Sequence, residues 1–259
     1  MSEPASPSPA VTIDRRDGVA VVMLKRGDRL NALSRAVLGE LKDAALALRS
    51  DVSVHAVVLA GDPIFTAGAD LKDPANRARE AAGLLERREM LRAGPDACDA
   101  FAALDQVTIA AIEGFAIGGG VALAAACDFR VMGAGAYLRL PEIPLGMNMS
   151  WHTVPRLVAL GGPARTKKLT LFGAPMKADE ALAAGFADEI APDGQVLEAA
   201  LALAPARIAK RAIASAADAL GGATSYADLD QFALTATSGD YREAVTAFLE
   251  KRSPRFTGQ

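Results

Sequence analysis

The chain has few of the side chains that build metal centres, disulfide scaffolds or histidine-based catalysis. Its 259 residues include two cysteines and two histidines. Cys98 and Cys127 lie in apolar stretches without the spacing of a metal or redox motif, and His55 and His152 are far apart in the sequence. We therefore expect no metal site and no histidine triad. Cysteines used so sparingly are typical of a protein from the reducing cytoplasm.

The chain also has no excess of positive charge. The net charge is −3 and no cluster of lysines or arginines occurs, which argues against nucleic acid as a partner. The contents of 51% hydrophobic and 23% charged residues are ordinary for a soluble globular protein. Residues 1–10, MSEPASPSPA, have neither the basic segment nor the apolar centre of a signal peptide, so they predict a disordered tail.

One long apolar run extends from Val107 to Cys127, and Glu113 is its only charge. Its length would suit a membrane helix, and Gly114 and Gly118 have the spacing of a membrane dimerisation motif. Three consecutive glycines would weaken such a helix at its centre, however, and charged residues follow Cys127 almost at once. The run therefore favours a strand, a tight glycine turn and a buried helix over a membrane span.

The glycine turn is Gly118–Gly120, which opens an alanine-rich segment with the composition of a buried helix. It lacks the third glycine of a dinucleotide fingerprint, because Ala122 and Leu123 follow, and it lacks the lysine of a phosphate loop. Glycine lets the backbone approach a ligand closely, and a helix N-terminus presents free N–H groups. The turn therefore predicts a site for an anion, or for an oxygen that becomes anionic during a reaction.

Hydrophobic periodicity predicts an α/β core followed by a helical C-terminal part. The expected core elements are a hairpin of Val11–Arg15 and Val19–Lys25, a helix capped by Ser34 and running to about Arg49, strands at Val54–Leu59, Val107–Ile112 and Tyr137–Leu140, and a helix over about 80–104. Strands that alternate with helices indicate βαβ units and a sheet covered on its faces. From about residue 155 onward the pattern is nearly all helical and alanine-rich.

Another glycine turn, Phe65–Lys72, follows the strand at Val54–Leu59. In chain order it is the first turn, and Gly118–Gly120 is the second. Taken alone, it is an ordinary strand-to-helix turn in which Asp70 acts as a cap. It repeats the design of the second turn, however, and adjacent parallel strands place such turns at one sheet edge, where ligands of α/β proteins bind. One backbone N–H from each turn could then point at a single oxygen, which is the geometry of an oxyanion hole.

A proton carrier is suggested by Glu142, which follows a predicted strand in the segment Pro141-Glu142-Ile143-Pro144. Its neighbours are apolar, and a carboxylate against an apolar wall has a raised pKa and can act as an acid or base near neutral pH. The alternative is a surface glutamate at the end of a strand. The two glycine turns favour the first interpretation.

Several segments carry a family resemblance in their order and spacing. They are Asn31-Ala32-Leu33, VVLAGDPIFTAGADLK (57–72), AAIEGFAIGGGVALAAACDFRV (110–131), LPEIPLG (140–146), ADEALAAGFADEI (178–190) and FLEKRSPRF (248–256). Together they resemble the crotonase superfamily, also called the enoyl-CoA hydratase/isomerase family, over about residues 11–259. The FTAGAD and GGGVALAAACD elements are the most specific part of this resemblance.

The resemblance implies a spiral of ββα units with a helical region for oligomerisation. It divides the chain into an α/β core over 11–195 and a helical region over 196–259 that would build trimers and cover CoA. Assembly would be a homotrimer or a dimer of trimers. The implied substrate is an acyl-CoA thioester, so coenzyme A is part of the substrate and no separate cofactor is expected.

The resemblance also assigns roles by position. It implies that the N–H groups of Ala69 and Gly119 form the oxyanion hole and that Glu142 is a catalytic glutamate. The backbone around Ala67, Ala69 and Leu71 would hold the adenine end of CoA. The remaining residues expected near the substrate are Asp70, Lys72, Gly118, Ala122 and Trp151. We interpret the Met and Trp side chains of 147–152 as walls of the acyl pocket, and His152 as a structural hydrogen-bonding group.

One departure from the family pattern bears on the reaction. Hydratases of this family carry a first catalytic glutamate two residues after the glycine triplet, where this chain has Ala122. Two carboxylates commonly activate the water of hydration, whereas one suffices to move a proton between two carbons. The sequence therefore favours an enoyl-CoA isomerase. A hydratase remains possible if His152, Asn148 or an acidic residue of 73–90 supplies the second group, and a non-catalytic acyl-CoA binder is the third alternative.

Overall fold

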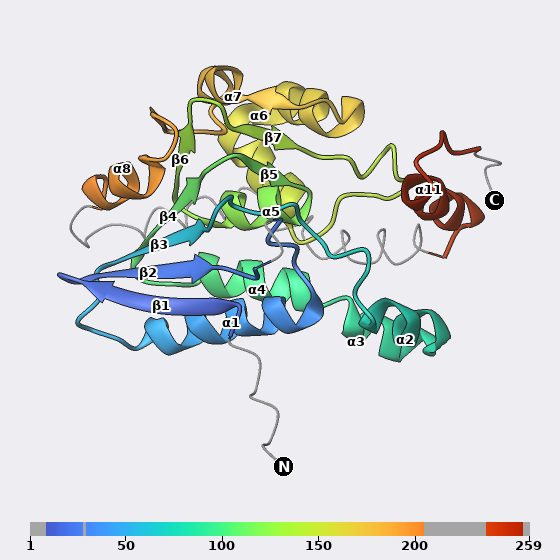
Figure 1. The fold of residues 1–259 in the computed structure, drawn as a ribbon, viewed down its shortest axis with the longest axis horizontal. Helices are drawn as coiled ribbons and strands as arrows, with labels where there is room; N and C mark the ends of the chain where they lie inside the picture. The colour runs from blue at the N-terminus through green and yellow to red at the C-terminus, as the bar shows by residue number, and fades with distance from the viewer. Residues whose placement is uncertain (1–8, 28–29, 205–236, 256–259) are drawn as a thin grey trace, which may run out of the picture.

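The computed structural model describes residues 9–27, 30–204 and 237–255. Its centre is a six-stranded sheet (Figure 1) with the strand order β1-β2-β3-β4-β6-β9. The bounds are β1 Val11–Arg16, β2 Val19–Leu24, β3 Ala56–Gly61, β4 Val107–Ile112, β6 Phe129–Gly133 and β9 Glu189–Ala191. β1 and β2 form an antiparallel hairpin, and every other pair in this sheet is parallel.

A second, three-stranded sheet consists of β5 (Phe115–Ile117), β7 (Tyr137–Arg139) and β8 (Met176–Lys177). The helices are α1 Arg35–Arg49, α2 Ala75–Ala81, α3 Leu84–Met90, α4 Ala93–Ala102, α5 Gly119–Ala126, α6 Thr153–Phe172, α7 Ala178–Ala184, α8 Val196–Ala202 and α11 Gly239–Leu249. Within the described ranges, no helix is both long and apolar enough to cross a membrane.

Apolar side chains fill both faces of the large sheet. On one face, α1, α4 and α5 contribute Leu41, Phe101 and Leu123 to a core that includes Leu59. On the other face, α8 packs its Val196 against the sheet. Because the central strands are buried on both faces, their sequences are continuous apolar runs and do not alternate between apolar and polar residues.

Helix α1 confirms the capping prediction. The Ser34 hydroxyl accepts a hydrogen bond from the Val37 N–H at 3.3 Å, and the apolar residues at helical spacing are buried. This cap satisfies one of the N–H groups that a helix start leaves without an intrahelical partner.

The structure corrects three other expectations. The single helix over 80–104 is divided into α2, α3 and α4. Gly83 is the N-cap of α3, Leu91 and Arg92 separate α3 from α4, and α3 buries none of its residues. The part after residue 155 is not all helical, because the short strands β8 and β9 lie within it.

The third correction concerns the chain's first ordered residues. Ala10, placed in the predicted disordered tail, accepts a hydrogen bond from Lys25 at 2.7 Å and packs against the core, whereas residues 1–8 lie outside the described ones. Residues 205–236, half of the predicted trimerisation region, also lie outside them.

Candidate active site

The two predicted glycine turns lie against each other, as their positions after the adjacent parallel strands β3 and β4 require. Thr66 bridges to the strand before the second turn, since its N–H donates to Phe115 and its carbonyl accepts from Ile117, both at 3.2 Å. Gly68 has φ +82°, and a Cβ there would lie 2.2 Å from the Ile117 carbonyl oxygen. Only glycine allows the turns to approach this closely.

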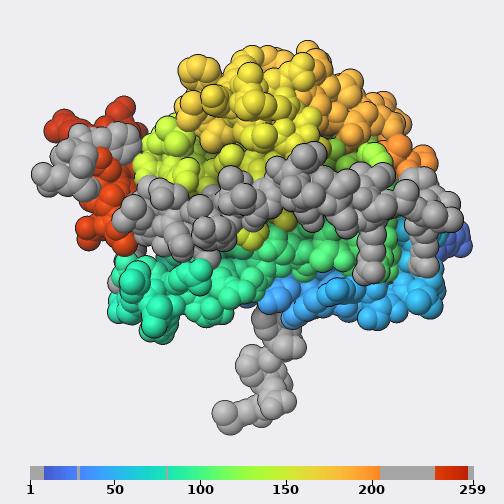
Figure 2. Space-filling view, turned by 180° about the vertical axis from the view of Figure 1, so that it is seen from behind, coloured from blue at the N-terminus to red at the C-terminus, as the bar shows by residue number. Residues whose placement is uncertain are grey.

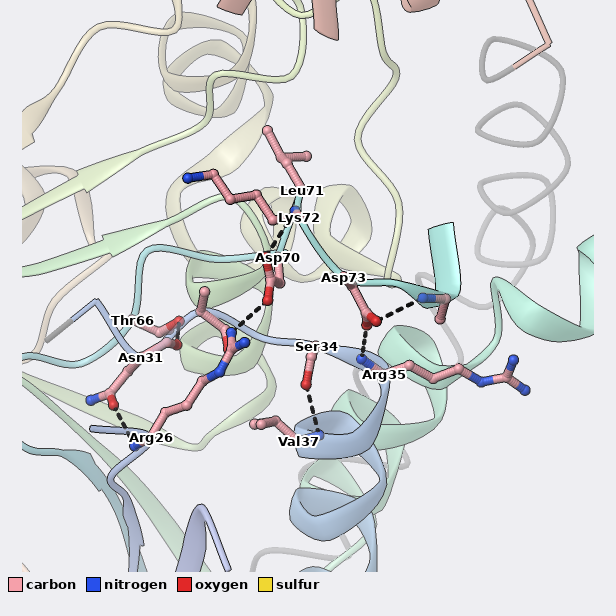
Figure 3. Close-up of polar contacts among 12 residues, drawn as sticks. Arg26, Asn31, Ser34, Arg35, Val37, Thr66, Asp70, Leu71, Lys72 and Asp73 are labelled. Atoms are coloured by element: carbon pink, nitrogen blue, oxygen red, sulfur yellow. Dashed lines mark hydrogen bonds and ion pairs between the residues drawn. The ribbon is translucent and has the colours of Figure 1, made fainter. Parts of the chain in front are cut away.

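Most backbone N–H groups of the first turn are used to hold it in place. Those of Ala67 and Asp70 donate to Leu30 and Leu33 at 2.8 and 3.1 Å. The Gly68 N–H donates to the Thr66 hydroxyl at 3.0 Å. The Thr66 hydroxyl in turn donates to the carbonyl of the buried Asn31 at 2.6 Å (Figure 3).

The N–H groups of Ala69 and Gly119 are among those of the two turns that have no acceptor in the part of the chain that the structure describes. Gly119 is the first residue of α5, a position whose N–H has no intrahelical partner. A Cβ on Gly68 would lie 3.2 Å from the Gly119 nitrogen, so the two turns present these groups close together. Ala69 and Gly119 also line the same cavities.

Asp70 and Lys72 end the first turn, and their side chains have different environments. The Asp70 carboxylate forms an ion pair with Arg26 at 2.6 Å and accepts the Lys72 N–H at 2.9 Å (Figure 3). Asp70 thereby fixes the end of the turn. The side chain of Lys72 is exposed and lines neither of the two cavities that contain Glu142.

Glu142 is buried where the chain leaves β7. Its side chain is 8% exposed, and its Oε2 atom finds no hydrogen-bond partner among the described residues. Burial raises the pKa of this carboxyl to about 7, because removal from water disfavours the charged form. Oε1 lies 2.7 Å from the place that a Cβ on Gly118 would take, so the glycine at 118 makes room for the carboxyl.

Two cavities meet at Glu142. We call the cavity of about 360 Å³ that reaches Trp151 and α11 the distal cavity. The proximal cavity, of about 400 Å³, is lined by Ala67, Gly118 and apolar residues of 141–145. Their shared wall consists of Ala69, Leu71, Gly119, Glu142 and Met147. The residues predicted for catalysis are therefore brought together where the two cavities join.

Trp151 packs directly against the second glycine turn. A Cβ on Gly119 would lie 2.3 Å from its indole ring, and a Cβ on Gly94 of α4 would lie 2.0 Å from it. The ring therefore occupies space that only glycine leaves free on both sides, and it lines the distal cavity. The neighbouring His152 Nδ1 lies 3.0 Å from Asp99, which also accepts a hydrogen bond from Arg156.

Ala122 is fully buried in α5 and lines neither cavity. Among the described residues that line the distal cavity, the carboxylates are Glu142 and Asp70, and Asp70 is held by Arg26. The expected substrate contact of Ala122 therefore stays a prediction.

Sequence reasoning missed several polar residues of the distal cavity. They are Asn76, Arg79, Ser150, Tyr241 and Arg242. Arg79 and Tyr241 are 162 positions apart but are joined by a hydrogen bond of 3.4 Å. Residues so distant leave no local pattern, and Tyr241 and Arg242 lie just before the C-terminal segment that carried the resemblance.

Comparison with known proteins places the chain in a family. A sequence profile for enoyl-CoA hydratase/isomerase matches residues 14–259. The chain is 32% identical to the crotonyl-CoA hydratase of Syntrophomonas wolfei, with 95% of this chain and 97% of that protein covered. It is 34% identical to the 2,3-dehydroadipyl-CoA hydratase of Escherichia coli, with 95% and 98% covered.

Comparison of the fold with solved structures identifies the same family. The crystal structure of carnitinyl-CoA hydratase from Mycobacterium avium matches with a TM-score of 0.80 at 32% identity, over 97% of this chain and 100% of that one. The chain therefore has the crotonase fold and belongs to the enoyl-CoA hydratase/isomerase family, whose enzymes act on acyl-CoA thioesters.

Proposed function

We propose that this enzyme moves a double bond in an enoyl-CoA thioester, with Glu142 as its single proton carrier. The observation that carries the proposal is the position of one buried, unpartnered carboxyl oxygen beside two unpaired backbone N–H groups. A carboxyl with a pKa of about 7 is present both as base and as acid near neutral pH, which suits a group that takes up a proton and returns it.

The reaction begins with the thioester oxygen between the Ala69 and Gly119 N–H groups. The Glu142 carboxylate removes a proton from the α-carbon of a 3-enoyl thioester. The electron pair of that C–H bond moves toward the carbonyl, and the two N–H groups stabilise the negative charge that forms on its oxygen. Glu142 then returns the proton to the γ-carbon, and the double bond moves from position 3 to position 2.

The two cavities suggest where the parts of the substrate lie. The proximal cavity contains Ala67 and Leu71, around which the family resemblance places CoA. The distal cavity extends from Glu142 to Trp151 and has room for the acyl group. In this arrangement, the residues that lie beside the substrate are Ala67, Asp70, Leu71, Gly118 and Trp151. Lys72 and Ala122 do not line either cavity and so do not lie beside it.

A 2-enoyl-CoA hydratase is the second candidate, and it is favoured by the names of the two relatives cited above. Incubation of the purified protein with 2-enoyl-CoA and 3-enoyl-CoA substrates of several chain lengths distinguishes the candidates. An isomerase interconverts the two, and a hydratase forms 3-hydroxyacyl-CoA. An acyl-CoA binder does neither.

Ala122→Glu tests why the chain would favour isomerisation. We expect this variant to gain water addition to crotonyl-CoA, because it restores the second carboxylate where hydratases carry one. It should also unfold at a lower temperature, since Ala122 is fully buried and a buried carboxyl is costly. Ala122→Gln, which has the same size without a basic oxygen, is the control. Equal hydration rates in both variants and the wild type would contradict this role of position 122.

We also propose that the protein assembles as a homotrimer or a dimer of trimers in the cytoplasm, where its two buried cysteines stay reduced. The division at 195/196 stays part of this proposal, although α8 packs on the core sheet. The end of α6 supports association, because Leu171 and Phe172 are 56% and 75% exposed there. Sedimentation at micromolar concentration should show three or six chains, and an active monomer would contradict the proposal.

A further inference from the structure

The distal cavity has two cationic side chains that no carboxylate neutralises. Arg79 comes from α2 and Arg242 from α11, and both line the cavity that contains Glu142. The Arg79 guanidinium donates to the Tyr241 hydroxyl at 3.4 Å and has no ion pair within the described residues. The Arg242 side chain has neither a hydrogen bond nor an ion pair there.

Two other arginines near these cavities form ion pairs. Arg26 is joined to Asp70 at 2.6 Å. Arg252, which lines the proximal cavity, is joined to Glu243 and Glu250, each at 2.6 Å. Arg139 of the proximal cavity donates to the Gly173 carbonyl at 3.0 Å and has no ion pair among the described residues. In the distal cavity, Arg79 and Arg242 have none either. A cavity with unmatched positive charge attracts an anion, and a guanidinium matches the geometry of a carboxylate or phosphate.

The cationic groups stand apart from the reacting centre. Figures 1 and 2 show α11 and α2 at the same end of the molecule, which the hydrogen bond between Arg79 and Tyr241 also requires. Arg79 and Arg242 belong to α2 and α11, whereas Glu142 follows β7 and Gly119 begins α5, although all four line the same cavity. An anion bound by them would therefore be at the far end of an acyl group whose thioester reaches Ala69 and Gly119.

The distal cavity has a further polar group in its wall, which a pocket for a plain hydrocarbon chain would not need. The Ser150 hydroxyl is buried and has no hydrogen-bond partner in the described chain, although it borders the same cavity. Burying a hydroxyl without a hydrogen bond is unfavourable in free energy, so we expect a polar group of the ligand to form a hydrogen bond with it. A plain hydrocarbon chain would leave this hydroxyl without a hydrogen bond and would offer no anion to either guanidinium group.

We propose that the acyl group carries a second carboxylate at its distal end, so that the substrates are CoA thioesters of unsaturated dicarboxylic acids. Arg79 and Arg242 bind that carboxylate, and Tyr241 positions Arg79. This inference rests on the proposed function, because it assumes that the thioester lies at Glu142 and that CoA occupies the proximal cavity. The other anions that could meet these arginines are the phosphates of CoA, if CoA entered through the distal cavity instead.

The test compares two probes of equal chain length, the CoA thioesters of hex-2-enedioic acid and hex-2-enoic acid, together with their 3-enoyl isomers. The wild-type enzyme should show a kcat/KM for the dicarboxylic thioester at least on the order of tenfold higher, because each charge-assisted hydrogen bond contributes to its selection. Arg79→Met and Arg242→Met should each lower that ratio on the order of tenfold. Arg77→Met, an exposed arginine of α2 that lines neither cavity, should leave the ratio unchanged.

The outcomes separate the alternatives. A loss of equal size for both thioesters in the Arg79 and Arg242 variants would show that the arginines bind CoA phosphates, and would overturn the inference. Wild-type turnover without a preference between the thioesters would also overturn it and leave the proposed function standing. If neither thioester is turned over, the proposed function fails. The affinities of both thioesters, measured by calorimetry, then still decide whether the distal carboxylate is bound.

Discussion

Glu142→Gln should abolish turnover of enoyl-CoA substrates, with a loss in kcat of at least about a thousandfold. Glutamine keeps the size of the side chain but has no basic oxygen, so it cannot take the proton from the α-carbon. The binding of the CoA thioester should change little, because the proposed contacts to the thioester oxygen come from the backbone of Ala69 and Gly119. Steady-state kinetics and calorimetric titration with the same thioester measure the two effects separately.

The pH profile gives an independent readout of the same group. Glu142 must be ionised to accept the proton, and burial raises its pKa to about 7, so kcat/KM should rise as the pH passes through 7 and then level off. This rise should be missing from the residual activity of Glu142→Gln. Glu189→Gln, which changes an exposed glutamate of β9, is the matched control and should keep the wild-type profile. Wild-type rates in Glu142→Gln would exclude Glu142 as the proton carrier.

Gly119→Pro should lower kcat on the order of a hundredfold or more, because proline has no N–H to stabilise the charge on the thioester oxygen. Proline is tolerated at the first position of a helix, which Gly119 occupies in α5, so the helix itself should form. The circular dichroism spectrum of the variant should therefore match that of the wild type.

A matched variant separates the loss of the N–H from crowding. Any side chain at position 119 meets the indole ring of Trp151, because a Cβ there would lie 2.3 Å from it. Gly119→Ala adds this Cβ and retains the N–H, so the difference in kcat between the alanine and proline variants measures the N–H alone. Equal activity of the two folded variants would show that the N–H of Gly119 takes no part in catalysis.

The parts of the fold that could be predicted are those in which local sequence and packing agree. Helix α1 follows from a serine cap and a regular apolar face, and β4 from a run of apolar residues. The approach of the two glycine turns could be predicted as well, because parallel neighbouring strands end at the same edge of a sheet.

The remaining features depend on contacts that no local pattern records. The segment 80–104 has helical composition throughout, but it is divided before Leu84 and again at Leu91 and Arg92, and Gly94 of α4 leaves room for the ring of Trp151. Strands β8 and β9 have only two and three residues, too few for an alternating pattern. Arg79 and Arg242 could not be assigned to the site, because they meet only through the packing of α11 near α2.

The identity of the product formed from 3-hexenoyl-CoA tests the central claim most directly. Nuclear magnetic resonance of the reaction mixture reports both the position of the double bond and any 3-hydroxyacyl product. We predict that the wild-type enzyme converts 3-hexenoyl-CoA to 2-hexenoyl-CoA without appreciable 3-hydroxyhexanoyl-CoA, and that Glu142→Gln leaves the substrate unchanged. Accumulation of 3-hydroxyhexanoyl-CoA from 2-hexenoyl-CoA without migration of the double bond, or migration that persists in Glu142→Gln, would contradict a single-carboxylate isomerase.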